Sequence, residues 1–148
     1  MPGPGMPSGL QIDAANNNLD WARHDGRVYL AFRTAPRHWA SDEARMVVLS
    51  AEAGAESDPK AAWSLEATFD LPDRDLREPR FLTIGDSLFF YFFEADSQPG
   101  VFSPNSIRVS IRRGRADWTE SEPIFEPGHV VWRTKWRNGT AWGPTKDS

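Results

Sequence analysis

The stretch DGRVYLAF at residues 25–32 returns sixty residues later as GDSLFFYF at residues 85–92. A second pair keeps the same interval: LSAEAG at residues 49–54 is matched by VSIRRG at residues 109–114. The β-branched and aromatic residues between turn residues are typical of strands. A fixed period of this size indicates stacked units, because one small sheet cannot bury both of its faces alone. The sequence therefore predicts an all-β fold, a partial β-propeller of four-stranded antiparallel blades.

The pattern places four strands in each of two units and opens a third. We predict strands at 19–24, 28–33, 45–50 and 63–69, then at 80–84, 88–93, 106–111 and 118–125, and finally at 130–136 and 140–142. The pairs Asp25-Gly26 and Asn138-Gly139 are typical of two-residue hairpin turns. The continuously apolar run at 88–93 predicts a strand that is buried on both faces.

These strands divide the chain into a flexible leader at 1–17, a first blade at 18–76, a second blade at 77–128 and the start of a third at 129–148. Closed propellers generally have about four to eight blades. The 148 residues therefore predict a fragment of a larger ring, or a protein that completes its ring by self-association.

Composition narrows the classes of function. Hydrophobic residues make up 39% of the chain and charged residues 26%, which is typical of a soluble globular protein. The net charge of −4, with scattered basic residues, disfavours nucleic acid as a partner. The sequence has no cysteine and no apolar run that could cross a bilayer. We expect no metal, cofactor or membrane partner, and the cellular compartment is left open.

Two segments resemble the Asp box of sialidases and bacterial neuraminidase repeat proteins, a Ser-x-Asp-x-Gly-x-Thr-Trp pattern. The first is Ser50-x-Glu52-x-Gly54, with Trp63 further on, and the second is SIRRG at 110–114, with Trp118 following. In both, glycine is expected to provide a positive φ in the turn and the serine hydroxyl to bond the local backbone. The box is a mark of the fold and not of an activity.

The first strands resemble those of five-bladed glycosidases that act on furanosides. Those enzymes place a catalytic Asp in an Asn-Asp-Pro-type start before a Gly-x-Tyr strand, and an Arg-Asp-Pro motif in a later blade. Here NNLD at 17–20 precedes GRVY at 26–29, and Arg77-Glu78-Pro79 precedes the second unit. The resemblance implies Asp20 and Glu78 as an acid and base pair for glycoside cleavage, a reaction that needs two carboxyl groups about 5 to 9 Å apart.

In a propeller the start of each first strand faces the central channel. Alignment of the hairpins puts Asp20, Arg80 and Arg133 at equivalent positions at the channel mouth. Sialidases use arginines from such positions to bind a substrate carboxylate, and a planar guanidinium suits that contact. We therefore expect an anionic sugar. The alternative is that these polar side chains only pair with one another across the blades.

Other residues complete the predicted site. Asn18 and Arg77 are expected to help to anchor the substrate, and His38 and Trp39, on the long 34–44 connection, to bind a sugar ring by hydrogen bonding and stacking. Sialidases use a tyrosine nucleophile, but Tyr29 and Tyr91 fall inside apolar strands and are predicted to pack there.

FRTAP at 32–36 is similar to the Phe-Arg-Ile-Pro motif of sialidases, but it ends a strand where that motif opens one, so we do not expect it to be part of the site. The sequence thus predicts a glycan-acting propeller, either a glycoside hydrolase of sialidase-like or furanosidase-like type or a non-catalytic propeller that binds carbohydrate or protein.

Overall fold

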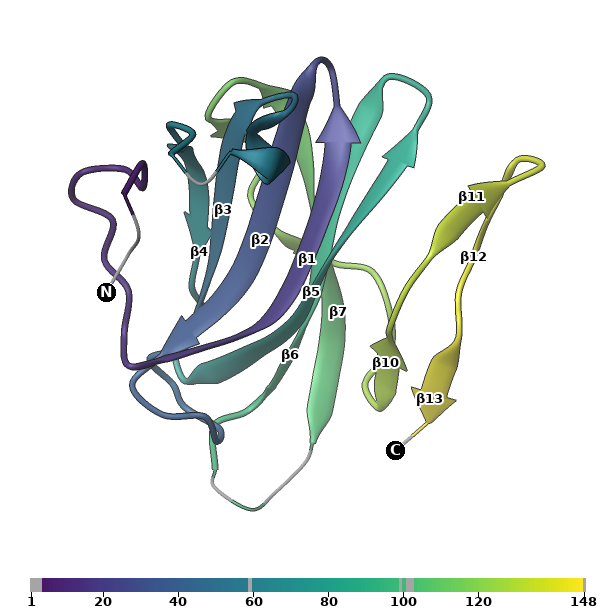
Figure 1. The fold of residues 1–148 in the computed structure, drawn as a ribbon. Coiled ribbons are helices and arrows are strands. Elements are labelled where there is room, and N and C mark those ends of the chain that lie inside the picture. The colour runs from purple at the N-terminus through teal and green to yellow at the C-terminus, as the bar shows by residue number, and fades with distance from the viewer. Residues whose placement is uncertain (1–3, 59, 99, 101–102, 148) are drawn as a thin grey trace.

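The computed structural model describes residues 4–58, 60–98, 100 and 103–147, and these form antiparallel sheets (Figure 1). The all-β prediction is confirmed. Within the described ranges the one helical element is η1, a single 3₁₀ turn at Ala55–Ser57. No helix in this part of the chain is long and apolar enough to span a membrane.

Two sheets, one of four strands and one of five, make up most of the molecule. The first sheet contains β1 (Ala15–His24), β2 (Arg27–Ala35), β3 (Arg45–Glu52) and β4 (Ser64–Phe69). The second contains β5 (Arg74–Ile84), β6 (Ser87–Asp96), β7 (Pro104–Gly114) and β8 (Asp117–Trp118), and β9 (Glu122–Pro123) also pairs with β7. Two short ladders follow, one of β10 (His129–Val131) with β13 (Thr145–Asp147) and one of β11 (Lys135–Arg137) with β12 (Thr140–Trp142).

Both hairpin turns that the sequence predicts are present. Asp25 and Gly26 connect β1 to β2 with φ values of 49° and 68°, and Asn138 and Gly139 connect β11 to β12 with 51° and 78°. Two successive residues with positive φ are what a type I′ turn requires, and Asn-Gly and Asp-Gly adopt this conformation at low cost. These turns fix the register of the strands on either side.

β6 is buried on both faces, as the apolar run at 88–93 predicts. Phe90 and Phe92 point into a core shared with Tyr29 of the first sheet, while Tyr91 and Phe93 point to the opposite side and pack with the third group of strands. Alternation of side chains along β6 places consecutive aromatic residues on opposite faces. The sheets are therefore stacked in chain order, with the second in the middle (Figure 1).

The fourth strand of the second unit, predicted as continuous over 118–125, is instead interrupted. Between β8 and β9, side chains replace part of the backbone pairing with β7. The Ile111 amide of β7 donates to the side chain of Thr119 (Oγ1, 2.9 Å), and the Arg108 guanidinium of β7 donates to the Ser121 carbonyl at 2.5 Å. Pro123 in β9 has no N–H to offer to the ladder. The prediction of one unbroken strand is wrong for this reason.

The first strand of the third unit is also interrupted, between β10 and β11, where one strand was predicted over 130–136. The Trp132 carbonyl accepts a hydrogen bond from Arg80 Nε, and the Thr134 amide donates to the Tyr91 hydroxyl at 2.9 Å. Side chains of the second sheet thus bind the backbone groups that would otherwise continue the ladder.

The segment before β1 is bound to the first sheet and to the residue that precedes β4, and Asp13 of this segment also pairs with Arg45 of β3. The Gly5 carbonyl accepts a hydrogen bond from the Trp63 amide at 2.8 Å, and the Asp13 amide donates to Thr34 Oγ1 at 2.7 Å. β1 begins at Ala15, inside the range that we predicted as a leader at 1–17. β5 begins at Arg74, so the predicted boundary between 76 and 77 falls within a strand.

The segments that resemble an Asp box follow the expected geometry only in part. Gly54 has a φ of 99°, as predicted, but in the second segment the residue with positive φ is Ala116 and not Gly114. The Ser50 hydroxyl donates to the Glu66 carboxylate at 2.5 Å, and the Ser110 hydroxyl donates to the Thr119 carbonyl at 2.7 Å. Both serines therefore join neighbouring strands, where a bond within the turn was expected.

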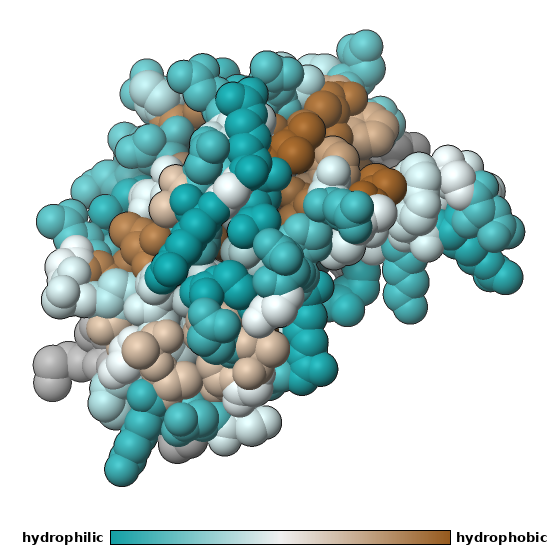
Figure 2. All heavy atoms as spheres, turned by 90° about the horizontal axis from the view of Figure 1, so that it is seen from above, coloured by the Kyte–Doolittle hydropathy of each residue, from teal (hydrophilic) through white to brown (hydrophobic). Residues whose placement is uncertain are grey.

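The third group of strands covers the second sheet incompletely. Figure 2 shows apolar side chains gathered between the main body and the strands that project to the right. A hollow of about 300 Å³ lies there, lined by Phe89 and Val109 of the second sheet and by Val131 and Ala141 of the third group.

Candidate functional site

Two bulges in equivalent strands create the site. The register of β1 shifts between Asn17 and Leu19, and that of β5 shifts between Arg77 and Arg80. At each bulge one residue has a positive φ: Asn18 at 49° and Glu78 at 52°. A bulge turns its side chains away from the regular alternation of the strand and is frequent beside functional sites.

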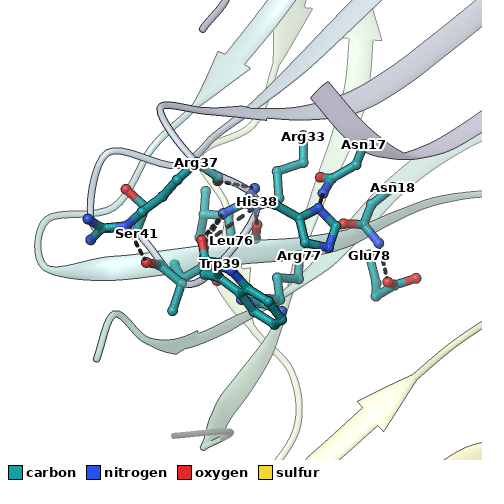
Figure 3. Close-up of polar contacts among 12 residues, drawn as sticks. Asn17, Asn18, Arg33, Arg37, His38, Trp39, Ser41, Leu76, Arg77 and Glu78 are labelled. Carbon is teal, nitrogen blue, oxygen red and sulfur yellow. Dashed lines mark hydrogen bonds and ion pairs between the residues drawn. The ribbon is translucent and has the colours of Figure 1, made fainter. Parts of the chain in front are cut away.

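The two bulge residues face each other across the sheets. Asn18 Nδ2 donates a hydrogen bond to one carboxylate oxygen of Glu78, and Arg80 Nη2 donates to the other at 2.5 Å (Figure 3 shows the Asn18 contact). Both oxygens of the Glu78 carboxylate are thus used, and the Asn18 and Arg80 side chains are held on either side of it.

Arg80 also connects the second sheet to the third group of strands. Its Nε donates to the Trp132 carbonyl, and its Nη1 donates to the Pro79 carbonyl at 2.7 Å. Beside these contacts is an open hollow of about 320 Å³, a volume within the range of small-ligand sites. Its lining residues are Arg77, Glu78, Arg80, Phe93, Val130 and Trp132. Trp132 is 53% exposed, so its indole is accessible from solvent.

Arg77, which also lines the hollow, is held by Asp75. Its Nε donates to Asp75 Oδ2, and its side chain remains 28% exposed. Asp75 is fully buried, and its Oδ1 accepts a hydrogen bond from Arg33 Nη2 at 2.7 Å. A buried carboxylate needs such compensation, since desolvation disfavours its charged form. One carboxylate therefore orients two guanidinium groups.

His38 and Trp39 lie on the connection between β2 and β3, next to the bulge of β1 (Figure 3). Asn17 Nδ2 lies 2.7 Å from His38 Nδ1, and the His38 and Trp39 rings meet edge to face with centroids 5.6 Å apart. The Trp39 residue is 70% exposed. A large flat aromatic surface in water, with amide and imidazole groups beside it, suits contact with the apolar face of a sugar ring.

Asp20 is held inside the protein by two contacts. Its Oδ2 accepts a hydrogen bond from the Phe81 amide at 2.9 Å, and its Oδ1 pairs with Arg133 Nη2 at 3.1 Å. Asp20 is buried, whereas the Arg133 side chain is 68% exposed. The alternative drawn from the sequence was that these polar side chains pair with one another between units. Asp20 and Arg133 do pair in this way, and so do Asn18 and Glu78.

Tyr91 is part of the packing beneath these residues, as predicted. Its hydroxyl lies 2.6 Å from Thr134 Oγ1 and accepts the Thr134 amide hydrogen at 2.9 Å. Burial raises the pKa of the Tyr91 phenol above its ordinary value of 10.0. Tyr29 is fully buried in the core between the two large sheets.

The ionic side chains in and beside the hollow, which we call the cluster, carry a net charge of one positive unit. Its guanidinium groups belong to Arg33, Arg77, Arg80 and Arg133, and its carboxylates belong to Asp20, Asp75 and Glu78. Four positive groups against three negative groups leave one positive charge. A single carboxylate or similar monoanion would balance it.

Most of the predicted site residues are close together. The bulges bring Asn18 and Arg77 to Glu78 and Arg80, and the ion pair brings Asp20 to Arg133. His38 and Trp39 form the neighbouring loop surface. Of the two predicted catalytic carboxylates, Glu78 lines the hollow, whereas Asp20 is buried against the Phe81 amide.

Six residues of the site were not predicted, namely Asn17, Arg33, Asp75, Phe93, Val130 and Trp132. Arg33 lies in the FRTAP segment, whose similarity to a sialidase motif is a signal for this residue, although the segment ends a strand where the motif opens one. Trp132 directly precedes the predicted Arg133. Asp75 carried a weaker signal, an acidic residue two positions before Arg77.

Comparisons with protein-family models, with curated proteins and with solved structures give no match to this chain. The function is therefore argued from the geometry. Within the described ranges, no group of three or more His, Cys, Asp or Glu side chains could hold a metal ion.

Proposed function

We propose that this chain is a segment of a β-propeller and that it binds an anionic sugar in the hollow between the bulge of β5 and Trp132. The propeller proposal is supported by the stacking of successive antiparallel sheets, in which β1, the first strand of the first sheet, lies beside β5, the first strand of the second. The third group of strands lies against the other face of the second sheet, β10 beside β7 and β11 beside β5, and a buried apolar cluster lies on each face of that sheet. Such stacking around an axis is the basis of propeller architecture.

The lining of the hollow is the observation that carries the ligand proposal. Arg77 and Arg80 offer planar donors that suit a carboxylate, and Trp132 offers an exposed indole at the same opening. The single excess positive charge of the cluster favours a monoanionic ligand over a neutral one. Together these groups match a sugar that carries one carboxylate, such as a sialic acid or a uronic acid.

Recognition is favoured over cleavage by the placement of the acidic groups. Cleavage by the common mechanism uses two carboxyl groups on either side of the bond. Glu78 is the one acidic residue among those that line the hollow, and both of its oxygens are bonded to Asn18 and Arg80. We therefore propose a carbohydrate-binding role for the described part of the chain, and a separate assay with aryl glycosides decides whether the site also cleaves its ligand.

Calorimetric titration with methyl glycosides of N-acetylneuraminic acid and glucuronic acid tests this proposal. We expect saturable binding of at least one of them and none of methyl galactoside. Trp132→Ala and Arg77→Gln should each weaken binding about tenfold or more, because each removes a contact worth roughly 1.4 kcal/mol or more.

Matched controls exist for both variants. Trp142→Ala removes another exposed indole, and Arg74→Gln removes another half-exposed guanidinium that pairs with Asp96. Neither residue lines the hollow, so neither change should affect the affinity. Equal binding of the neutral glycoside would contradict the anion proposal. Release of nitrophenol from aryl sialosides or aryl arabinosides, abolished by Glu78→Gln, would show that the site is catalytic.

A further inference from the structure

The guanidinium of Arg33 joins two parts of the molecule that lie on different sheets. Arg33 is near the end of β2 and is 1% exposed. Its Nη2 pairs with Asp75 Oδ1 at 2.7 Å, and its Nε donates to the Leu76 carbonyl at 3.0 Å (Figure 3). These contacts attach the first sheet to the beginning of β5.

The same guanidinium holds the loop that follows β2. Arg33 Nη1 donates to the Arg37 carbonyl at 3.4 Å, and Nη2 donates to the Trp39 carbonyl at 3.2 Å. The loop side chains His38 and Trp39 are exposed, so the bonds from Arg33 to the loop carbonyls are among the contacts that hold the loop, together with the contact between Asn17 and His38. A lysine could not replace them, because one ammonium group lacks the planar set of five donors of arginine.

Asp75 extends these contacts to the hollow. While its Oδ1 pairs with Arg33, its Oδ2 accepts a hydrogen bond from Arg77, which lines the hollow. The Trp39 carbonyl, Arg33, Asp75 and Arg77 therefore form one continuous chain of polar contacts. An anion that bonds to Arg77 competes with Asp75 for the Arg77 guanidinium. When the bond between Asp75 and Arg77 weakens, the attraction between the Asp75 carboxylate and Arg33 becomes stronger.

We propose that Arg33 is a positioning residue that couples the loop at 36–41 to the ligand in the hollow. The inference has two halves: that Arg33 holds the loop (the loop half), and that ligand binding strengthens this hold (the ligand half). The ligand half rests on the proposed function. An anion bound at Arg77 strengthens the contact between Asp75 and Arg33 and so holds the loop more firmly. Because coupling between two equilibria is reciprocal, a loosened loop weakens anion binding by the same factor.

Limited proteolysis with trypsin tests the loop half without any ligand. Arg37 is exposed in the loop, and Arg115 is exposed in the turn between β7 and β8, so the ratio of cleavage at these two sites separates local opening from global unfolding. We expect Arg33→Lys to raise the Arg37 to Arg115 ratio about tenfold, since it removes charge-assisted hydrogen bonds to two loop carbonyls.

Two further variants keep this test decisive. Asp75→Asn retains the shape of the side chain but weakens its hold on Arg33, and it should raise the same ratio in the event that Arg33→Lys does not fold. Arg108→Lys is the control, because Arg108 pairs with Glu94 in the second sheet and does not touch the loop. A ratio that stays within about twofold of the unmodified protein in both test variants would overturn the inference.

The ligand half is tested with the methyl glycoside of N-acetylneuraminic acid. We expect the ligand to lower the Arg37 to Arg115 ratio in the unmodified protein, and Arg33→Lys to weaken the affinity about tenfold although Arg33 does not line the hollow. Unchanged affinity in Arg33→Lys, with normal binding by the unmodified protein, would overturn the coupling and leave the proposed function standing. No binding by the unmodified protein would overturn the proposed function and the coupling to it, while the ligand-free ratio still decides whether Arg33 holds the loop.

Discussion

Asn18 and Glu78 lie sixty residues apart, occupy the same bulge in successive sheets, and are hydrogen-bonded to each other through their side chains. The sequence repeat is thus also a spatial contact, because equivalent strands β1 and β5 lie side by side. Each bulge residue has a left-handed backbone conformation, which costs free energy unless the surrounding contacts compensate. The compensation here is a shared hydrogen-bond network that positions Arg80 beside the hollow.

The backbone of Asn18 should make alanine a worse replacement than glycine. Both changes remove the hydrogen bond to Glu78, but only alanine retains a Cβ at a φ of 49°. We expect Asn18→Ala to lower the free energy of unfolding by about 1 kcal/mol more than Asn18→Gly does, measured by urea denaturation. At the nearby Asn16, whose φ is not positive, the order should reverse. The same order at both positions would contradict this account of the bulge.

The ion pair of Arg33 with Asp75 should be far more sensitive to substitution than an exposed pair. Arg33→Met leaves the fully buried Asp75 carboxylate without its main partner, so we expect a loss of about 3 to 5 kcal/mol in the free energy of unfolding. Arg45→Met breaks a partly exposed pair with Asp13 and should cost about 1 kcal/mol or less. Chemical denaturation measures both, and equal losses would show that burial does not determine the cost.

The two tyrosines should respond in opposite ways to loss of the hydroxyl group. The Tyr29 hydroxyl is buried without a hydrogen-bond partner among the described residues, whereas the Tyr91 hydroxyl has two contacts with Thr134. Tyr29→Phe should leave the free energy of unfolding unchanged or raise it, and Tyr91→Phe should lower it by about 1 kcal/mol. Thermal and urea denaturation of the two variants give the comparison. A clear loss in Tyr29→Phe would reveal a partner for that hydroxyl.

Stability should fall at alkaline pH because of the same tyrosines. Burial raises the pKa of both phenols above the ordinary value of 10.0. Above about pH 10 the unfolded chain therefore loses these protons while the folded protein retains them, and the free energy of unfolding decreases. Below that pH the phenols are protonated in both the folded and the unfolded state, so they do not make the free energy of unfolding depend on pH. The Tyr29→Phe and Tyr91→Phe double variant should show a smaller decrease between pH 9.5 and 11, and an unchanged slope would exclude the phenols as its cause.

The sequence predicted the parts of the fold that depend on local patterns. Turn residues such as Asp25-Gly26 and the apolar run at 88–93 identified hairpins and a strand buried on both faces, because turn type and side-chain alternation act over a few residues. The predicted strands at 19–24 and 80–84 correspond to the portions of β1 and β5 that follow the bulges. The portions before the bulges were missed, since a register shift disrupts the alternation on which strand prediction relies.

Long-range side-chain contacts explain the remaining differences. The interruption before β11 depends on Arg80 and Tyr91, which are more than forty residues away from their backbone partners. Likewise, Asp75 became part of the site through Arg33, a residue of another sheet. No local pattern reports such contacts. The alignment of the hairpins nevertheless brought out Asp20 and Arg133, because equivalent positions in stacked units point to the same region.

The most direct test of the central claim is to observe where an anionic sugar binds. In a protein labelled with ¹⁵N, the indole signal of Trp132 can be assigned with a Trp132→Phe variant and followed during titration with the methyl glycoside of N-acetylneuraminic acid. We predict that this signal and the backbone amides of Arg77, Glu78 and Arg80 shift together and reach saturation, while the indole signals of Trp136 and Trp142 stay in place. Saturable shifts at Trp136 and Trp142 alone, or no shifts at any ligand concentration, would contradict the assignment of the hollow as the binding site.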